Sequence, residues 1–557
     1  MLETTTMPSS ASSIHQAPEG GEPIQEASSK SLGFWLIIAS LCIVAFTASL
    51  DGSILAIALP QISSSLQIGD KYVEVANCFL FAQTVVQPGI AQLCNIFGRR
   101  WPMIITVVIF ALGSGIAGGA KNTATIIAGR TVQGLGSGGI MLLVELIVCD
   151  LVPLRERGKY LGIVLSTAAL GSIVGPVVGG ALADVNWRWC FYLNLPICAL
   201  VIPIQFLFLR IKHHAPQWKD VITRVDWIGN LVFIASISSL LIGLTFGGTV
   251  YPWSSWRSIV PIVLGVAGWA SFHAYEYYIK DANPCLPPHI FGNRTSNAAL
   301  YMIFLTSMLL QWVCLFWPVY FLAVRGTGLT QTGVNFLPYM FLLIPGSAIA
   351  GLTLSKTGHY RPLHAVGFVL STLGPGLNTL LGKNTPAGEW AILQIVDALG
   401  RAFILPTTLP AVLASLPERD VAAATGVYSF LRSFGYVWGA TIPGIIFNNR
   451  FNELSYRISD PTVRQTLADG RAYQFTSGAY LKTLEPNIRS EVLDVYLQAL
   501  KVVWYGALGF GASGLIAVAV EKHVPLRTNL ETTYGMEDKK ESELEDPAKV
   551  EEAKEGS

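Results

Sequence analysis

Three polar or charged residues lie inside long apolar stretches of this 557-residue chain, where such side chains are costly and usually functional. Asp51 follows a long apolar run and has no cation near it in the sequence. Because the loss of water disfavours the anion, a carboxyl group in this setting can bind and release a proton near neutral pH. Arg130 can stabilise a carboxylate or bind a substrate anion, and Gln133 follows it on the same helix face. We therefore predict that these three residues couple the binding and release of a proton to the function of the protein. The alternatives are a structural Asp51 and an Arg130 that extends to the membrane surface.

Asp397 and Arg401 form a second candidate pair, because a spacing of four residues places them on one helix face. In an apolar segment such an ion pair is most simply a structural brace, and a part in proton transfer is the alternative. Arg432 lies eleven residues after Val421 in another apolar run, and we include it among the candidate substrate-cavity residues. Glu145 lies near the end of its run, so we expect it at the membrane surface.

Membrane-spanning helices must position these residues. The chain is 52% hydrophobic and 13% charged, whereas a soluble protein of this size carries about 25% charged residues. Apolar runs of about 18 or more residues, the length that crosses a bilayer, recur along the chain. The fourteen spans that we predict are residues 34–54, 73–93, 102–119, 124–147, 160–183, 190–210, 227–247, 258–279, 298–322, 334–354, 363–382, 390–413, 422–445 and 500–520.

Lys and Arg residues gather in the short loops after the even-numbered spans, which indicates that these loops are cytoplasmic. Both chain ends are then cytoplasmic. Residues 446–499 form a long extracellular loop, in which we expect a short amphipathic helix over Ile488–Leu500.

The chain also repeats itself in one direction. Residues 95–102 after the second span match residues 355–362 after the tenth, and residues 153–156 match residues 417–420. We therefore predict an all-α membrane protein with two six-helix bundles and two inserted helices, a design of secondary transporters. The domains that we assign are a disordered tail 1–32, an N-terminal bundle 33–211, a linker with two helices 212–297, a C-terminal bundle 298–521 that includes loop 446–499, and an acidic disordered tail 522–557.

Glycines and a proline interrupt the fifth span, although both are poor helix formers. Gly171, Gly175 and Gly179 recur every four residues and form one smooth face that another helix can approach closely. Pro176 removes a backbone hydrogen bond and permits bending. We predict that these residues and Gly180 form a seam along which the two halves of the protein move.

A loop after the second span resembles the cytoplasmic gating loop G-x-L-x-D-x-x-G-R-[RK] of the major facilitator superfamily. Its residues are Asn95, Gly98, Arg99 and Arg100. In that family an aspartate pairs with the arginine and favours one conformation. Asn95 replaces the aspartate here, so the resemblance implies a neutral hydrogen bond at this point, or a substitute carboxylate from Glu145 or Asp150.

Further motifs narrow the resemblance to the fourteen-helix drug:proton antiporter branch of this family. Within that branch, the sequence is similar to fungal multidrug and toxin efflux pumps. The run from Leu50 to Pro60 resembles the pattern L-D-x-T-x-x-x-x-A-L-P, with Ser53 for the usual threonine and Ala56 for the usual asparagine. Arg130-Thr-Val-Gln-Gly resembles the R-x-x-Q-G motif, and the glycine run of the fifth span resembles the antiporter signature.

The resemblance implies a proton-coupled exporter of small amphipathic compounds, such as a toxin, a secondary metabolite or a drug, that works by alternating access. It implies the proton gradient as the energy source, no cofactor or metal, no nucleic acid, and a monomer in the plasma membrane, with the vacuolar membrane as the alternative location. An importer of a siderophore or nutrient and a non-transporting receptor or scaffold are the other hypotheses. The sequence contains no G-x-x-x-x-G-K-[ST] motif and no set of catalytic motifs, which disfavours ATP-driven export and enzyme chemistry.

An aromatic stripe completes the candidate residues. Trp312, Phe316 and Tyr320 recur every four residues in the ninth span. They are predicted to form one wall of an apolar substrate cavity, and simple helix packing is the alternative.

Overall fold

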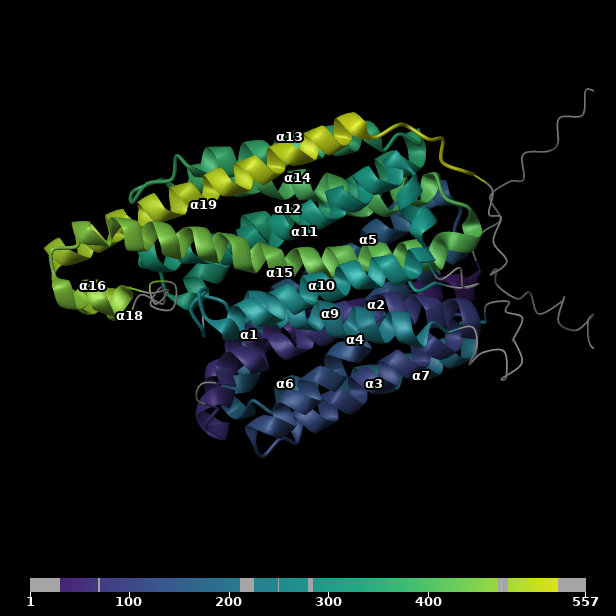
Figure 1. Cartoon of the computed structure of the whole chain (residues 1–557), viewed down its shortest axis with the longest axis horizontal. Coiled ribbons are helices and arrows are strands. Elements are labelled where there is room, and N and C mark those ends of the chain that lie inside the picture. Colours follow the sequence, from purple (N-terminus) through teal and green to yellow (C-terminus); the bar gives the residue numbers. More distant parts are fainter. Residues whose placement is uncertain are drawn as a thin grey trace, which may run out of the picture.

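The computed structural model describes residues 31–68, 71–210, 225–248, 250–278, 284–468, 472 and 479–528. Long helices lie side by side in two bundles, one from each half of the chain, and both described ends of the chain lie at the same end of the molecule (Figure 1). The predicted disordered tails fall outside the described residues, apart from Ser31, Leu32 and residues 522–528.

The two bundles are built from corresponding helices, with an extra pair between them in the sequence. The first bundle contains α1 Leu32–Leu66, α2 Tyr72–Phe97, α3 Arg100–Gly118, α4 Thr123–Leu151, α5 Leu154–Asn186, α6 Trp189–Tyr192 and α7 Asn194–Phe208. The inserted pair is α9 Trp227–Phe246 and α10 Trp256–Tyr278. The second bundle contains α11 Arg294–Val319, α12 Leu329–Thr357, α13 Arg361–Asn378, α14 Ala387–Ala414, α15 Val421–Leu454 and α19 Pro486–Val520.

Every predicted span coincides with one of these helices, and the sixth corresponds to α6 and α7 together. Within the described residues, eleven helical segments are long and apolar enough to cross a membrane; α2, α13 and α15 are not among them. The all-helical membrane fold is therefore confirmed, and the count of fourteen crossings stays a prediction.

Capping side chains and glycines set the helix ends, and contact with lipid explains why the outer faces of the helices are apolar. Asn122 accepts a hydrogen bond from the backbone N–H of Thr125 at 2.8 Å and caps α4. Gly98 has φ = 77°, a conformation that favours glycine, and it ends α2 before α3 begins. Large apolar side chains such as Leu112 (58% exposed) and Leu231 (70% exposed) lie on outer faces, as expected where the solvent is lipid.

Glycine residues allow close packing inside each bundle. A Cβ at Gly171 would meet the backbone of Phe46 on α1, and one at Gly179 would meet the backbone of Ile54. In the second bundle, Gly435 of α15 faces the backbone of α11 in the same way. The predicted close approach of another helix to the glycine face is therefore confirmed, but that helix is α1 of the same bundle and not a helix of the other half.

The two bundles contact each other mainly through α5 with α12 and α14, and through α15 with α2 and α4. Gly162 of α5 faces the backbone of Ser347 on α12, and the hydroxyl of Ser166 donates to the carbonyl of Ile344 at 3.2 Å. These contacts lie toward the end of the molecule where α5 begins at Leu154 and α12 ends at Thr357. We call this end the closed end.

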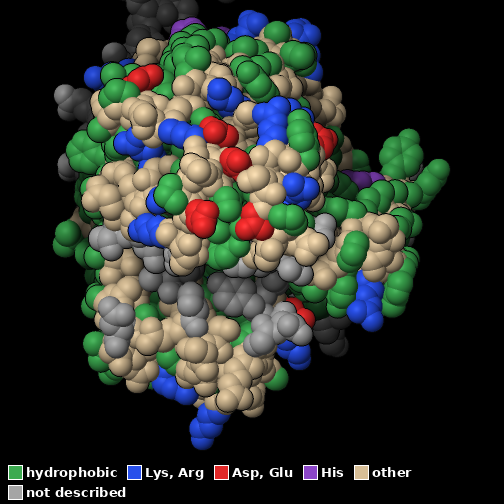
Figure 2. Space-filling model, turned by 90° about the vertical axis from the view of Figure 1, so that its left-hand side faces the viewer, with side chains coloured by type: hydrophobic (Ala, Val, Ile, Leu, Met, Phe, Trp, Pro, Cys, Tyr) green, Lys and Arg blue, Asp and Glu red, His purple; other side chains and the backbone are tan. Residues whose placement is uncertain are grey.

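At the opposite end, α15 and α19 extend beyond the bundle and join the short helices α16 Pro461–Leu467 and α18 Ala479–Thr483 (Figure 1). The apolar core of the second bundle continues into this helical extension, where it includes Phe451, Val463 and Tyr496. Charged side chains of both signs cover the part of this end where the extension lies (Figure 2). The described part of the predicted loop 446–499 is therefore mostly helical, and the helix expected over Ile488–Leu500 lies within α19. The two flanks of the predicted loop continue α15 and α19 because their buried apolar faces pack together.

The chain beyond α19 follows the closed end. The hydroxyl of Tyr360 donates to the carbonyl of Lys522 at 2.9 Å and accepts the N–H of Val524 at 2.7 Å. Burial raises the pKa of this hydroxyl to about 12, so it keeps its proton at physiological pH. Residues 522–528 therefore differ from the predicted disordered tail, because fixed partners offset the entropy lost on ordering.

Candidate functional site

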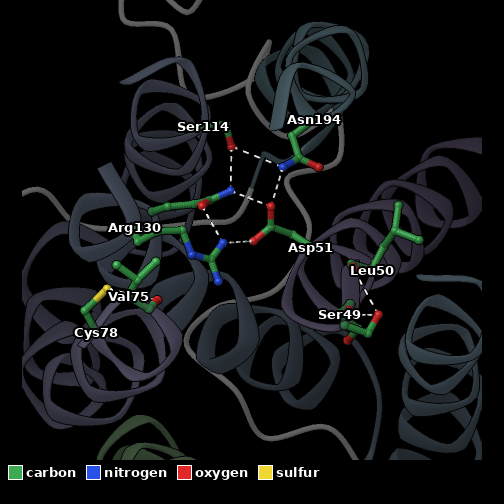
Figure 3. A network of polar contacts seen from close by, with 10 residues as sticks. Ser49, Leu50, Asp51, Val75, Cys78, Ser114, Arg130 and Asn194 are labelled. Carbon is green, nitrogen blue, oxygen red and sulfur yellow. Dashed lines mark hydrogen bonds and ion pairs between the residues drawn. The ribbon is translucent and has the colours of Figure 1, made fainter. Parts of the chain in front are cut away.

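Asp51 lies at the centre of a network of polar side chains inside the first bundle (Figure 3). Its Oδ2 accepts a hydrogen bond and ion pair from Arg130 Nη1 at 2.5 Å. Its Oδ1 accepts from Gln133 Nε2 at 2.7 Å and from Asn194 Nδ2 at 2.8 Å. The hydroxyl of Ser114 accepts from the same two amides, at 2.8 and 3.2 Å. None of the five side chains is more than 1% exposed.

Four different helices supply this network. Asp51 comes from α1, Ser114 from α3, Arg130 and Gln133 from α4, and Asn194 from the first residue of α7. The structure therefore brings together the three residues predicted for proton coupling. Arg130 supplies the positive charge that Asp51 lacks among its neighbours in the sequence.

The glycine face of α5 fixes the turn of α1 that carries Asp51. A Cβ at Gly171 would meet the backbone N of Leu50, and a Cβ at Gly175 would meet the backbone O of Leu50. The hydroxyl of Ser53 also reaches the carbonyl of Gly171 at 3.5 Å. The motif glycines therefore act on the network through the position of the α1 backbone.

Gly171→Leu tests this dependence. The new side chain would clash with α1 backbone atoms, and overpacking of this kind costs about 1–3 kcal/mol. We expect a lower thermal unfolding midpoint in detergent and a loss of transport in vesicles. Gly444→Leu is the matched control, because a Cβ there meets no atom within 4 Å. Equal unfolding midpoints in the two variants would contradict the argument.

Ser114 and Asn194 belong to the network, although sequence reasoning did not select them. The one available signal was an amide side chain at the start of an apolar run, where Asn194 precedes Pro196. Ser114 gave no signal, because serine is common in apolar helices and bonds to its own backbone there.

The network is electrically balanced only while Asp51 is charged. The guanidinium of Arg130 otherwise contacts Gln133 Oε1 at 2.7 Å and the ring of Phe79, whose centroid is 4.2 Å away. A proton on Asp51 would leave the Arg130 charge buried without a carboxylate, and an uncompensated buried charge is costly. Protonation would therefore change the relative energies of positions of α1 and α4, which is the requirement for coupling a proton to movement.

Asp397 and Arg401 form a buried ion pair in the second bundle, but unlike Asp51 and Arg130 they belong to the same helix. Both belong to α14, both are 0% exposed, and they pair four residues apart. Arg401 also donates to the backbone carbonyl of Leu309 on α11 at 3.4 Å. Since carboxylate and cation share one helix, a proton on Asp397 would not release one helix from another. The geometry favours the structural brace over the coupling role.

Asp150 is the carboxylate that pairs with the gating-loop arginine. Arg99 Nε donates to Asp150 Oδ2 at 2.7 Å, and its Nη1 donates to the carbonyl of Cys94 at 2.7 Å. Asn95 is exposed, and Arg100 donates to the carbonyl of Phe206 at the end of α7. Of the alternatives that the sequence left open, the structure selects Asp150.

Glu145 instead connects the two bundles. It forms an ion pair with Arg432 of α15 and accepts a hydrogen bond from Ser429 at 2.6 Å. Nearby, Gln87 of α2 donates to Ser433 at 3.2 Å. Glu145 is 2% exposed and is buried between the bundles near the end of α4. Arg432 pairs with Glu145 and is not free in a cavity, which corrects the expectation for Arg432. Two long helices from different bundles cross here, so each charge finds its partner on the other bundle.

A second ion pair joins the bundles at the closed end. Arg157 of α5 contacts Glu418 at 3.1 Å, and Arg527 of the C-terminal segment lies 3.5 Å from the same carboxylate. The carbonyl of Arg527 accepts the N–H of Arg155 at 3.2 Å. The closed end is therefore held by charges from both bundles and from the chain beyond α19.

The predicted aromatic wall is part of the packed core. Trp312, Phe316 and Tyr320 are at most 1% exposed. Trp312 packs on Phe510 and Phe316 on Phe447, while the Tyr320 hydroxyl donates to the carbonyl of Gly382 at 2.9 Å. The cavity prediction for this stripe is wrong, because the stripe faces neighbouring helices of its own bundle.

Comparisons with known proteins agree with this architecture. The family model described as Major Facilitator Superfamily matches residues 41–440. The MFS efflux transporter aclA of Aspergillus oryzae (strain ATCC 42149 / RIB 40) is 46% identical over 515 residues, which cover 92% of this chain and 93% of that protein. The efflux pump FUS6 of Gibberella moniliformis (strain M3125 / FGSC 7600) is 42% identical over 531 residues, which cover 94% of each chain.

Two solved structures share the fold at low sequence identity. The proton:xylose symporter XylE has a TM-score of 0.53 at 13% identity and covers 89% of this chain and 98% of its own. The human organic anion transporter MFSD10 has a TM-score of 0.51 at 14% identity and covers 85% of this chain and 100% of its own.

Proposed function

Because this chain belongs to the major facilitator superfamily, we propose that it is a proton-coupled antiporter that exports small amphipathic organic compounds such as a toxin, a secondary metabolite or a drug. The names of its relatives aclA and FUS6 support the direction of transport, since both are efflux proteins. The observation that carries the proton coupling is the buried Asp51–Arg130 ion pair, whose two members belong to different helices.

The proposed cycle starts from the observed arrangement, with the closed end toward the cytoplasm and both chain ends on that side of the plasma membrane. A proton from outside neutralises Asp51 and deprives Arg130 of its carboxylate. The bundles then rock, the ion pairs of Glu145 with Arg432 and of Arg157 with Glu418 separate, and substrate enters from the cytoplasm. Release of the proton inside restores the Asp51–Arg130 pair and returns the substrate-loaded protein to the outward-facing state.

The proton gradient is the proposed energy source, without a further cofactor, and a single chain is the proposed transport unit. One charge that enters down a membrane potential supplies about 2.3 kcal/mol per 100 mV. That free energy corresponds to about a 50-fold accumulation of exported substrate.

Transport in vesicles of known orientation tests the proposal. A panel of amphipathic fluorescent dyes is measured with an imposed pH gradient, with the gradient collapsed by an ionophore, and in vesicles without the protein. We expect movement from the cytoplasmic to the external side that requires both the protein and the gradient. Gradient-dependent movement in the other direction would overturn export, and movement indifferent to the gradient would overturn proton coupling.

A further inference from the structure

The cycle described above does not use a groove on the outer side of the first bundle. This groove lies between α3 and α7 and has a volume of about 550 Å³. Its lining is apolar and includes Val108, Leu112, Gly115 and Ile116 of α3 and Leu195 and Ile202 of α7. In Figure 1 these two helices form the outer edge of the first bundle, away from the second bundle.

The groove opens toward lipid rather than toward water. Val108 is 46% exposed and Leu112 is 58% exposed, and α3 and α7 are both long and apolar enough to lie in the membrane. A Cβ added at Gly115 would meet no atom within 4 Å, so the glycine leaves open space at the groove. An apolar chain from the bilayer can fill such a space at no cost in unsatisfied polar groups.

Basic and aromatic side chains lie at the closed end of the same two helices. The Arg100 guanidinium is 4.7 Å from the ring centroid of Phe206, and Trp101 is 54% exposed beside it, with its ring 6.2 Å from that of Phe206. Arg210 is exposed two residues after α7 ends. Arginines next to an aromatic residue at a membrane surface are suited to an anionic lipid headgroup.

We propose that the α3–α7 groove binds an acyl chain of an anionic glycerophospholipid whose headgroup contacts Arg100 and Arg210. The helix rise of about 1.5 Å per residue places Val108 about 12 Å and Leu112 about 18 Å along α3 from Arg100. Half of a bilayer core is about 15 Å thick, so a chain anchored at Arg100 reaches the near end of the groove at Val108. Gly115, at the far end, is about 22 Å from Arg100 along α3, so only the tip of a long extended acyl chain reaches it. The assignment to the cytoplasmic leaflet rests on the proposed orientation, whereas the site itself does not depend on transport.

The bound lipid would lie directly behind the Asp51 network. Gly115 and Leu195, which line the groove, follow Ser114 and Asn194, which belong to the network. An acyl chain between α3 and α7 therefore supports the two helices that bring these side chains to Asp51.

Lipid retention by the purified full-length chain tests the site without any transport assay. Delipidated protein is incubated in detergent with equal amounts of phosphatidylserine and phosphatidylcholine of the same acyl chains, and bound lipid is counted by native mass spectrometry. Each arginine facing an anionic headgroup contributes about a fivefold preference. We expect the native chain to prefer phosphatidylserine by about 25-fold and the double variant Arg100→Gln/Arg210→Gln to lose that preference.

Gly115→Leu fills the groove and is expected to remove retention of both lipids, with an unchanged thermal midpoint because the added side chain meets open space. The controls are Gly444→Leu in the second bundle and Arg257→Gln, whose arginine also lies over aromatic rings but belongs to α10. Equal retention of the two lipids by the native chain, or equal retention by Gly115→Leu and Gly444→Leu, would overturn the proposal. Because retention is measured without a gradient, a failed dye assay would leave this result unaffected.

Discussion

Asp51→Asn is expected to abolish accumulation against a gradient while substrate exchange across the membrane continues. The amide resembles the protonated carboxyl group in shape, but it can neither take up nor release a proton. The accumulation ratio in vesicles should therefore fall by about 50-fold per 100 mV of driving force, to the passive value. Counterflow of labelled for unlabelled substrate should persist, because exchange needs no net proton movement.

Two controls make this result specific to coupling. Asp494→Asn makes the same change at an exposed carboxylate of α19, which is 56% exposed, and should transport normally. Asp51→Asn/Arg130→Gln removes the arginine charge that the single variant leaves buried without a carboxylate, so it separates loss of coupling from loss of folding. Gradient-driven accumulation that survives in Asp51→Asn would exclude this residue as the coupling group.

Arg432→Met is expected to open the closed end. The loss of the arginine leaves Glu145, which is 2% exposed, as an unpaired charge between the bundles. Such a charge costs about 3–5 kcal/mol while the end stays shut, and water relieves that cost once the bundles separate. The population with this end open should rise by about 100-fold or more.

Cys149 is a native reporter for that change. It lies four residues after Glu145, on the same face of α4, and is 0% exposed. We expect a membrane-impermeant maleimide on the closed-end side to label Cys149 much faster in Arg432→Met than in the native chain, and Cys149→Ser identifies the signal. Glu145→Gln/Arg432→Met removes both charges and should restore protection. Equal labelling of the single and double variants would show that the unpaired charge is not the cause.

The motif of the gating loop does not determine which carboxylate pairs with its arginine. The motif identified Arg99 as a residue in need of a carboxylate and narrowed the choice to a neutral contact, Glu145 or Asp150. Both acids lie on α4, five residues apart, and therefore point to different sides of the helix. Only the packing of α2 and α15 around α4 decides that Asp150 contacts Arg99 and that Glu145 contacts Arg432.

The sequence by itself determined the helices, the repeat and the family. Runs of apolar residues long enough to cross a bilayer must form helices, because no other arrangement satisfies their backbone groups in lipid. A carboxylate and an arginine inside such runs could be selected as candidates from their cost and from the motifs around them, and the structure brings Asp51, Arg130 and Gln133 together in one network.

Only the tertiary structure decided which side of each helix faces a partner. Lipid is as apolar as a protein core, so hydropathy does not distinguish a buried stripe from an exposed one. For this reason the sequence did not show that Trp312 and Phe316 pack inside the second bundle, or that Gly171 packs on α1 rather than on the other half. Likewise, Asp51 and Arg130 are 79 residues apart in the sequence, and they meet only because α1 and α4 pack together.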